Sequence, residues 1–398
     1  MAVHAGDRSF RNPRHGLAAP AAAATLFQAP GALPERLVGD RESNKGSQAS
    51  FGIDFSGRTL RRSMGMNLNS WSEQRLAGQR LMAGFDGKRL GRQLQRLIAD
   101  LHLGGLILFK RNLESPRQIA DLCRAAQRHA RECGLPPLFI AIDQEGGQVA
   151  RLGPPFTRFP GNPAIRDKAD AERFARITAT ELAWVGINMN MAPVLDAAPE
   201  GFESIMAQRV FGSDPQRVAR LGEAVIAAMQ AGGVMAVAKH FPGIGRTRLD
   251  SHLDLPRLDE SLRSLEAYDL VPFRKAISSR VAGVMLSHVL YPQLDPEWPA
   301  SLSKPIARDL LRRQMRFDGV VMTDDLEMGA IACHYGFDAA VGQVLRADVD
   351  IALICRSAEK LRRAHALMVR KIGASQKRRA VAKASAARIM ALKGQYLD

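Results

Sequence analysis

The segment VMAVAKHFPGIGRTRLDSH, residues 234–252, places an unbroken apolar run directly before a group of ionisable side chains. Its first five residues are all apolar, which is typical of a strand that is buried on both faces. The remainder holds a lysine, two arginines, an aspartate and two histidines. A buried strand that ends in this way predicts that its carboxyl end delivers polar side chains to a pocket.

Seven further apolar runs occur along the chain, and they alternate with segments of helical spacing such as 115–133 and 215–233. Alternation of buried strands with helices predicts parallel βαβ units. Eight strands favour a single-domain (β/α)8 TIM-like barrel; a doubly wound α/β sheet is the alternative, because the first run is weak. The eight runs are RLMAGFD (80–86), GGLILFK (104–110), PLFIAID (137–143), NMNMAPVLD (188–196), VMAVAKH (234–240), AGVMLSH (282–288), GVVMTDD (319–325) and DIALIC (350–355).

Five of these runs pass directly from apolar to ionisable residues: FIAIDQE, PVLD, VAKH, MLSH and VMTDD. A single acid after a strand is often only a helix N-cap. Capping alone does not explain why five of the eight runs end in ionisable residues. A barrel does explain it, because it gathers its active-site residues at the carboxyl ends of its strands. The pattern therefore predicts one shared polar pocket, with the loop after the fifth strand reaching over it.

The chain is basic, with 56 Lys and Arg against 40 Asp and Glu, but the excess lies near its ends. Residues 356–398 hold 12 Lys or Arg and 2 Asp or Glu, in two segments with helical apolar spacing. We interpret them as basic C-terminal helices with solvated outer faces, and contact with a polyanion is the alternative. No aromatic interleaving or nucleic-acid motif accompanies them, so no nucleic-acid partner is expected.

Residues 1–70 mix Gly, Pro, Ala, Ser and Arg without sustained periodicity. This composition predicts a disordered basic N-terminal extension, which leaves residues 71–398 for the predicted (β/α)8 barrel and its basic C-terminal helices. The stretch RNPRHGLAAPAAAATLFQAPGA (11–32) faintly resembles a secretory leader, but Pro20 interrupts its weakly apolar core, so export is the less favoured reading. Four cysteines without metal or disulfide spacing favour a reduced, cytoplasmic setting, and no apolar run is long enough to predict membrane insertion.

Three side chains stand out as candidates for catalysis. Asp324 ends the run 319–325 and is followed by Asp325, whose side chain should point to the opposite side of the strand. One of the two acids can then face the pocket while the other caps the following helix. Asp250 and His252 lie two residues apart in a loop, a spacing that lets a carboxylate orient an imidazole as a proton carrier near neutral pH.

A second set of side chains is suited to holding hydroxyl groups: Asp143, Arg151, Arg209, Lys239 and His240. A carboxylate nucleophile with a separate acid/base in such a pocket is the equipment of glycoside hydrolysis. Lys239 equally fits a Schiff-base lyase, which needs a buried lysine with a depressed pKa. In the non-catalytic alternatives His240 is satisfied inside the barrel and His252 lies in a surface loop. No HxH or HExxH spacing indicates a metal, and the residues alone leave these alternatives open.

The motifs taken together resemble family 3 glycoside hydrolases. KHFPGIGRTRLDSHLDLP (239–256) resembles the pattern KHFPGHGxTxxDSHxxxP of the β-N-acetylglucosaminidases of the peptidoglycan-recycling type. The chain ends soon after the predicted barrel, which resembles the single-domain members. Further likenesses across most of residues 71–355, in the family's order, are SEQRLAGQRLMAGFDG, GGLILFKRN, AIDQEGGQVARL, NMAPVLD, QRVFGSDP, SHVLYPQLD and MTDDLEMGAI.

The resemblance implies a role for each candidate. Asp324 would be the nucleophile of a covalent glycosyl-enzyme, with His252 as the acid/base on a mobile loop, oriented by Asp250. Asp325 would be structural. The residues that would hold the N-acetylglucosamine ring are Asp143, Arg151, Arg209, Lys239 and His240. The implied activity is that of a retaining exo-β-N-acetylglucosaminidase (β-N-acetylhexosaminidase), acting as a cytoplasmic monomer on muropeptides and requiring neither a metal nor an organic cofactor.

Several positions depart from the family's pattern. Ile244 stands where the family has a second histidine, Arg246 replaces an acidic or small residue, and Gln148 replaces an arginine. A hydrogen bond to the reacting sugar, which an isoleucine cannot make, would contribute about 1–3 kcal/mol, so its loss would lower activity by about ten- to a hundredfold. Phosphorolysis stays open, because an imidazole base tolerates phosphate where a carboxylate would repel it. A Schiff-base lyase and a sugar-binding pseudoenzyme are the remaining alternatives.

Overall fold

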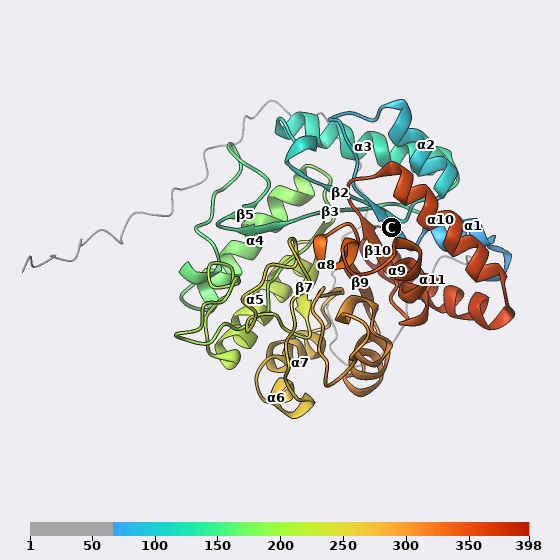
Figure 1. The fold of residues 1–398 in the computed structure, drawn as a ribbon. Coiled ribbons are helices and arrows are strands. Elements are labelled where there is room, and N and C mark those ends of the chain that lie inside the picture. The colour runs from blue at the N-terminus through green and yellow to red at the C-terminus, as the bar shows by residue number, and fades with distance from the viewer. Residues whose placement is uncertain (1–66, 398) are drawn as a thin grey trace, which may run out of the picture. The chain divides into compact units, whose positions relative to one another are not determined.

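In the computed structural model, which describes residues 67–397, each of the eight apolar runs contains a strand (Figure 1). The strands pair in parallel in the closed order β1-β10-β9-β8-β7-β6-β3-β2, so the predicted (β/α)8 barrel is confirmed. They are β1 (Leu81–Ala83), β2 (Gly105–Leu108), β3 (Phe139–Ile142), β6 (Met189–Asn190), β7 (Met235–Phe241), β8 (Gly283–Leu286), β9 (Val320–Asp325) and β10 (Ile351–Ile354).

The first strand, whose run was the weakest, is the one that closes the barrel. Met82 of β1 lies opposite Gly105 of β2 on one side and opposite Leu353 of β10 on the other. A doubly wound sheet would leave two open edges, so that alternative is wrong. A separate antiparallel pair, β4 (Gln144–Gly146) and β5 (Val149–Ala150), follows β3 and lies beside the barrel mouth.

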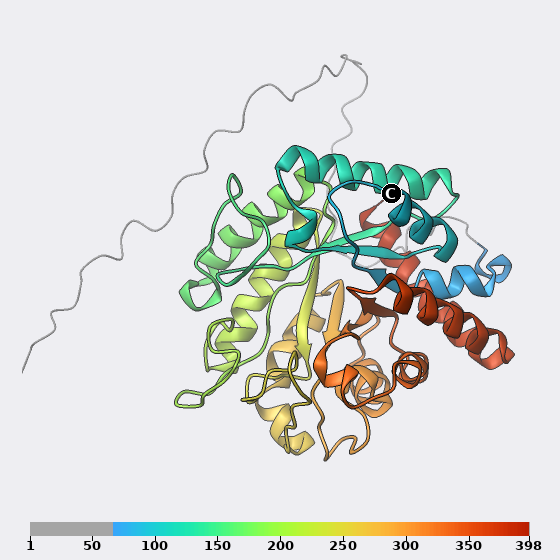
Figure 2. The ribbon, with the colours of Figure 1, turned by 45° about the horizontal axis from the view of Figure 1, so that its top comes forward.

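Helices surround the strands on the outside (Figures 1 and 2). They begin at capping residues that the sequence supplies, for example Asp214, whose side chain accepts from two backbone N–H groups at the start of α5. The helices are α1 (Glu73–Gly78), α2 (Arg92–Leu101), α3 (Pro116–Glu132), α4 (Lys168–Trp184), α5 (Pro215–Ala231), α6 (Leu262–Ala267), α7 (Leu270–Ser278), α8 (Gly329–Ala332), α9 (Phe337–Arg346), α10 (Ala358–Gly373) and α11 (Gln376–Tyr396). Three-residue 3-10 helices are η2 (Leu68–Ser70), η3 (Lys110–Asn112), η4 (Asn162–Ala164) and η5 (Ala300–Leu302), and η6 (Pro305–Gln314) is a ten-residue π-helix.

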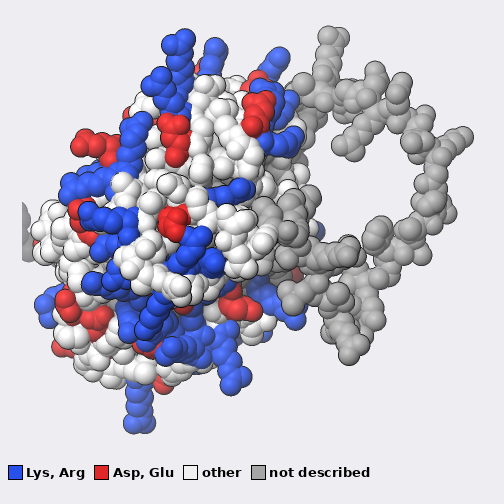
Figure 3. All heavy atoms as spheres, turned by 90° about the vertical axis from the view of Figure 1, so that its right-hand side faces the viewer, with Lys and Arg blue, Asp and Glu red and all other residues white. Residues whose placement is uncertain are grey.

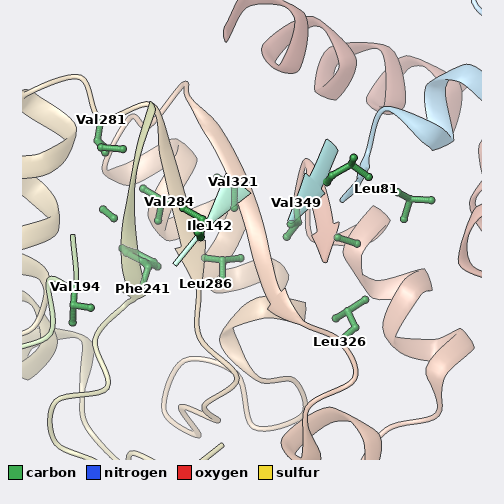
Figure 4. Packing of buried hydrophobic residues seen from close by; sticks show 14 of the residues in the cluster. Leu81, Ile142, Val194, Phe241, Val281, Val284, Leu286, Val321, Leu326 and Val349 are labelled. Atoms are coloured by element: carbon green, nitrogen blue, oxygen red, sulfur yellow. The ribbon is translucent and has the colours of Figure 1, made fainter. Parts of the chain in front are cut away.

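Buried side chains form two apolar layers, because neighbouring residues on a strand point to opposite faces. In β8, Val284 and Leu286 pack outward against the helices, as Figure 4 shows, while Met285 belongs to the layer inside the barrel. The inner layer is rich in methionine, whose flexible side chain fills irregular space. It includes Met82, Ile107, Phe139, Met189, Met235, Met322 and Leu353.

Helix α11 closes the N-terminal end of the barrel. Its residues Ile389 and Leu392 join the inner apolar layer, and the Lys393 ammonium donates to the carbonyl of Gly104, directly before β2, at 2.9 Å. The carboxyl ends of the strands remain for the functional site, as in other barrels of this architecture.

The predicted disordered extension, residues 1–70, lies outside the described residues except for 67–70. These four form η2 and its cap, and the Lys383 ammonium of α11 donates to the Asn69 side chain at 3.1 Å. The leader-like stretch 11–32 also lies outside the described residues. No helix between residues 67 and 397 combines the length and the apolar character that crossing a bilayer requires.

Candidate active site

A pocket of about 530 Å³ opens at the carboxyl ends of the barrel strands. All eight residues that the sequence analysis selected line it: Asp143, Arg151, Arg209, Lys239, His240, Asp250, His252 and Asp324. They come from segments far apart in sequence, which the barrel topology brings to one end. The location of the pocket at the strand ends is therefore as predicted.

A network of ion pairs forms one wall of the pocket. The Lys239 ammonium, almost fully buried, lies 2.8 Å from Asp143 Oδ1 and 2.7 Å from Glu145 Oε1. Arg209 holds both carboxylate oxygens of Glu145, at 2.7 and 3.0 Å, and Arg151 lies 3.1 Å from Asp143 Oδ2. Because the charges alternate and each carboxylate is shared, the network fixes its donors in place for a polar ligand.

The charges in this wall decide the protonation of its members. Burial opposes ionisation of Asp143, but the adjacent Lys239 and Arg151 outweigh it and hold the pKa of that carboxyl well below its usual range. Burial also disfavours the charged form of Lys239, yet Asp143 and Glu145 raise its pKa above the ordinary value. A Schiff-base lysine needs the opposite shift, so Lys239 lacks the property that the lyase alternative requires.

The two acids that end β9 have different surroundings. Asp325 is buried, and its Oδ1 accepts from the backbone N–H groups of Glu327 and Cys355, at 3.1 and 3.2 Å. Asp324 lies partly exposed in the pocket, and its carboxylate accepts from the N–H of Asp325 at 2.7 Å. Asp325 therefore holds the turn after the strand, and Asp324 offers a free carboxylate edge to a ligand.

Basic side chains surround Asp324 and keep it ionised. Burial favours its neutral form, but His288, His240 and Lys239, with the backbone N–H of Asp325, outweigh burial and lower its pKa. His288 is fixed because Nε2 donates to the carbonyl of Asp325 at 2.9 Å, which leaves Nδ1 to accept from the Ser301 hydroxyl at 2.7 Å. An ionised carboxylate beside these groups is a competent nucleophile near neutral pH.

Asp250 and His252 form a hydrogen-bonded pair on the loop that follows β7. Asp250 Oδ1 accepts from His252 Nδ1 at 2.8 Å and from the His252 backbone N–H at 2.9 Å. Burial acts against ionisation of Asp250, but these hydrogen bonds outweigh it and lower its pKa, so it stays a carboxylate. The imidazole is 59% exposed, and among residues 67–397 its hydrogen bond to Asp250 involves Nδ1, which leaves Nε2 for proton exchange with a ligand.

Three residues that contribute to the site were missed from the sequence: Glu145, Asp196 and His288. Asp196 is buried, and its carboxylate binds His240 Nδ1 at 2.8 Å and the backbone N–H of Ile244 at 2.8 Å. Each of the three stands at the end of an apolar run, in DQE, PVLD and MLSH. That signal was available, but it did not say which acid would be paired with which base.

The positions that depart from the family's pattern also lie at or near the pocket. Ile244 is buried among apolar side chains and lines the pocket, while its backbone N–H serves Asp196. Arg246 pairs with Glu260 at 2.7 Å and with the buried Asp269, so it fixes the base of the loop. Gln148 is exposed at the pocket rim. Between residues 67 and 397 no three His, Cys, Asp or Glu side chains are grouped as they would be to hold a metal ion.

Residues 73–392 match the model of the glycosyl hydrolase family 3 N-terminal domain. The chain belongs to this family. The resemblance drawn from the sequence motifs and the prediction of a glycoside hydrolase are thereby confirmed.

Named relatives of this family 3 chain are hexosaminidases. A β-hexosaminidase of Pseudomonas aeruginosa (strain LESB58) is 39% identical over 281 residues, which are 69% of this chain and 82% of the relative. A β-N-acetylglucosaminidase from Paenibacillus sp. str. FPU-7 superposes with a TM-score of 0.79 at 38% identity and covers 82% of this chain, which itself spans 63% of that longer protein. NagZ from Neisseria gonorrhoeae, solved with N-trifluoroacetyl-D-glucosamine, superposes with a TM-score of 0.66 at 31% identity. The match covers 79% of this chain and 97% of NagZ.

Proposed function

We propose that this protein is a retaining exo-β-N-acetylglucosaminidase that removes terminal N-acetylglucosamine from cell-wall muropeptides. The proposal is supported by relatives named as hexosaminidases and by a solved relative that holds an N-acylated glucosamine. Muropeptides are the substrate class because the sequence motifs resemble the peptidoglycan-recycling members of the family.

The observation that carries the proposal is the difference between Asp324 and the other pocket carboxylates. Asp143 and Glu145 are each held by two cationic side chains, and Asp250 is engaged with His252. Within the described residues, no side chain hydrogen-bonds to the Asp324 carboxylate, which accepts from one backbone N–H. It is therefore the pocket acid that is both ionised and available to attack a carbon.

The proposed reaction has two displacements at the anomeric carbon. Asp324 attacks C1 and forms a covalent glycosyl-enzyme, while His252 protonates the departing glycosidic oxygen from Nε2. The same imidazole then takes a proton from water, which attacks C1 and releases the sugar with its original configuration. Asp250 holds His252 Nδ1 throughout and so orients the ring.

The wall of ion pairs is the proposed sugar-binding surface. Asp143, Arg151, Arg209, Lys239 and His240 present fixed donors and acceptors to the ring hydroxyls. The Asp196 carboxylate fixes His240 by its Nδ1, which leaves Nε2 for the ligand. Fixed polar groups of this kind bind well because little conformational entropy is lost when the sugar arrives.

The setting of the proposed reaction is the cytoplasm, and the proposed active form is a monomer. All four cysteines, Cys123, Cys133, Cys333 and Cys355, are free thiols, which suits a reducing compartment.

Phosphorolysis is a second candidate, favoured by the acid/base being an imidazole. A neutral histidine next to the incoming acceptor does not repel phosphate, whereas a second carboxylate at that position would. The first displacement is the same in both reactions, so only the acceptor in the second step differs.

The proposal is tested by comparing the wild type with Asp324→Asn on a chromogenic N-acetyl-β-D-glucosaminide. The amide is isosteric but not nucleophilic, so release should fall by on the order of a thousandfold or more while the protein stays folded. Equal rates in the two proteins would rule out Asp324 as the nucleophile. Binding of N-acetylglucosamine by calorimetry without any turnover would instead identify a pseudoenzyme.

Mass spectrometry of the products from defined muropeptides identifies the acceptor. Incubation with phosphate should give free N-acetylglucosamine if the enzyme is a hydrolase and the sugar 1-phosphate if it is a phosphorylase. Intact muropeptides alongside a cleaved chromogenic substrate would contradict the proposed natural substrate but not the glycosidase.

A further inference from the structure

Two arginines of the active-site pocket, Arg111 and Arg356, have no part in the reaction proposed above. Arg356 lies at the mouth of the pocket, because it is exposed and follows the end of β10 by two residues. Strand β10 pairs with β9, with Leu353 opposite Asp325, so Arg356 stands beside the strand that carries Asp324. A residue at this place can contact the part of a substrate that projects from the pocket.

Arg356 differs from the other Lys and Arg residues of the pocket, because it has no ionic partner among residues 67–397. Its only hydrogen bond to a carboxylate in this range is made by its backbone N–H. The other cations each hold a carboxylate, in the pairs Arg111–Asp86, Arg151–Asp143, Arg209–Glu145 and Lys239–Asp143. A guanidinium without a protein partner at a pocket mouth is available to an anionic group of a ligand.

The backbone at Arg356 is fixed, although its side chain is not. Its N–H donates to Glu327 Oε2 at 2.6 Å, and the N–H of Ser357 donates to the same oxygen at 3.1 Å. The carbonyl of Cys355, the preceding residue, accepts from Arg111 Nη2 at 2.5 Å. The guanidinium therefore extends from a fixed point, which limits the conformational entropy that it loses when it binds a ligand.

The turn after β9, residues 327–330, holds both Arg356 and the acid/base loop. Glu327 accepts from the N–H of Arg356, and the N–H of Gly329 donates to the carbonyl of His252 at 3.3 Å. Met328, between these two anchors, lines the pocket together with Arg356 and His252. Since the proposed reaction protonates the leaving oxygen from His252, the leaving group must lie beside this turn.

The acids next to Arg356 are engaged with other cations. Glu327, whose side chain is only 4% exposed, lies 3.5 Å from the Lys360 ammonium. Asp86 lies 3.0 Å from Arg111. Each of these carboxylates is matched by a cation of its own, so the charge of Arg356 is left for a ligand.

The surface that continues from this part of the rim is basic. Arg356 leads directly into α10, and Figure 3, which faces the side that carries α1, α10 and α11, shows mainly Lys and Arg. Arg362, Arg363 and Arg370 of α10 are exposed. A surface of one sign attracts ligands of the opposite charge and speeds their association.

We propose that Arg356 is a specificity-determining residue that binds a carboxylate group on the aglycone, the part of the substrate that leaves. This inference rests on the proposed glycosidase function and restricts its substrates to those with an acidic aglycone. A guanidinium can hold a carboxylate by two parallel hydrogen bonds, which fix its orientation as well as its position. Muropeptides meet the requirement, because their peptides carry carboxylates.

The test compares two chromogenic N-acetyl-β-D-glucosaminides that differ only in the aglycone, 3-carboxy-4-nitrophenol and its methyl ester. For each protein, kcat/KM on the acid is divided by kcat/KM on the ester. Comparison of this ratio between proteins cancels the difference in reactivity of the two leaving groups. We expect Arg356→Gln to lower the ratio about three- to tenfold, mainly through KM, because the guanidinium contacts the aglycone and not the reacting atoms.

Further variants separate the charge of Arg356 from its shape. Arg356→Lys should keep part of the preference for the acid, since it retains the charge but not the paired donors. Arg356→Glu should lower the ratio below that of Arg356→Gln, because like charges repel. Arg131→Gln, which changes an exposed arginine in the last turn of α3 at the N-terminal end of the barrel, is the charge-matched control and should keep the wild-type ratio. Thermal unfolding shows that each variant is folded.

The outcomes distinguish this inference from the proposed function. Cleavage of both compounds with the same ratio in the wild type and in Arg356→Gln would overturn the inference and leave the glycosidase intact. An equal fall of the ratio in Arg131→Gln would show a general effect of charge and would overturn it as well. If the wild type cleaves neither compound, the proposed function is wrong and the inference is wrong with it.

Discussion

Asp325 is a buried carboxyl group next to the proposed nucleophile. Burial is the main reason that its pKa is raised to about 6, and the charges of Asp324 and Glu327 add to the effect. The hydrogen bonds that it accepts from two backbone N–H groups lower its pKa and so act in the opposite direction. An amide at this position could keep those hydrogen bonds through its oxygen while carrying no charge.

Asp325→Asn should therefore gain stability relative to the wild type as the pH rises. The folded-state pKa of about 6 lies above the unfolded value of about 4, so the folded wild type binds the extra proton between these values. Its contribution to stability is complete below pH 4 and is lost as the pH rises through 6. Urea unfolding at pH 4 and pH 7 should show the difference between variant and wild type growing by about 1–3 kcal/mol.

The control for this measurement is Asp121→Asn, which removes one carboxylate from the exposed face of α3. A difference that is the same at both pH values for Asp325→Asn would show that the Asp325 carboxyl does not titrate differently in the folded and unfolded states.

The pair of Asp250 and His252 yields a prediction about turnover. Asp250→Asn keeps an oxygen that can accept from the His252 backbone but loses the charge that orients the imidazole. We expect kcat to fall by about 10- to 100-fold with little change in KM, because the pair acts in the transition state. In the double variant Asp250→Asn/His252→Ala the loss should be no greater than in His252→Ala alone. Additive losses would mean that Asp250 acts independently of the imidazole.

Single residues of the pocket were predictable where spacing or strand position restricted them. Asp324, Asp250 and His252 follow from an acid at a strand end and from a two-residue separation in one loop. The pairing of Glu145 with Lys239 and Arg209 joins segments 64 or more residues apart. Such pairing depends on the closed barrel, so no local pattern in the sequence contains it.

At the scale of elements, the loop that carries His252 is docked on the start of α8. The N–H of Gly329 donates to the carbonyl of His252 at 3.3 Å, and that of Ala330 donates to Ser251 at 3.0 Å. His334, just beyond the helix, pairs with Asp254 of the same loop. Since β9 leads directly into this helix, the contact places the acid/base loop next to the strand that bears Asp324.

Gly329→Ala should disturb this contact and slow the reaction without unfolding the protein. A Cβ atom at residue 329 would lie 2.6 Å from the carbonyl of His252 and 2.7 Å from that of Leu253. The loop must then move away, and we expect kcat/KM to fall by about 10- to 100-fold, because a small displacement of a catalytic group is costly. Steady-state kinetics and thermal unfolding are measured together.

Gly336→Ala is the matched control, because its Cβ would meet nothing within 4 Å and it lies between α8 and α9. This variant should keep the wild-type rate. If Gly329→Ala also keeps it, the docking of the loop on α8 has no part in catalysis.

The elements themselves were the most predictable level of this structure. All eight apolar runs contain a strand, since a strand covered on both faces must be apolar throughout. The run at 80–86 was weak because β1 has only three residues, and its place in the barrel is secured by pairing with β10, more than 260 residues away. The docking of the His252 loop on α8 could not be predicted, because it rests on backbone hydrogen bonds that any sequence can form.

At the scale of the whole molecule, the C-terminal helix α11 inserts a lysine into the closed end of the barrel. Lys393 is fully buried, and its ammonium lies 4.9 Å from the centre of the Phe139 ring. The ammonium donates to Gln79 Oε1 at 2.8 Å and to the carbonyl of Gly104 at 2.9 Å. No carboxylate pairs with it within the described residues. Burial, and secondarily the charge of Arg75, lower its pKa to about 7.

This buried amine should make the stability of the whole barrel depend on pH in the alkaline range. The unfolded lysine titrates near 10.4, so between about pH 7 and pH 10 the unfolded chain binds one more proton than the folded one. Stability therefore rises with pH across this window, by about 1 kcal/mol per pH unit.

Lys393→Met removes this rise, whatever its effect at a single pH. Urea unfolding at pH 7, 8, 9 and 10 should thus give a stability difference between wild type and variant that changes by roughly 2–4 kcal/mol in favour of the wild type. Lys377→Met, exposed on the same helix, should run parallel to the wild type at every pH. Parallel curves for Lys393→Met as well would mean that Lys393 keeps its ordinary pKa and that α11 closes the barrel without this cost.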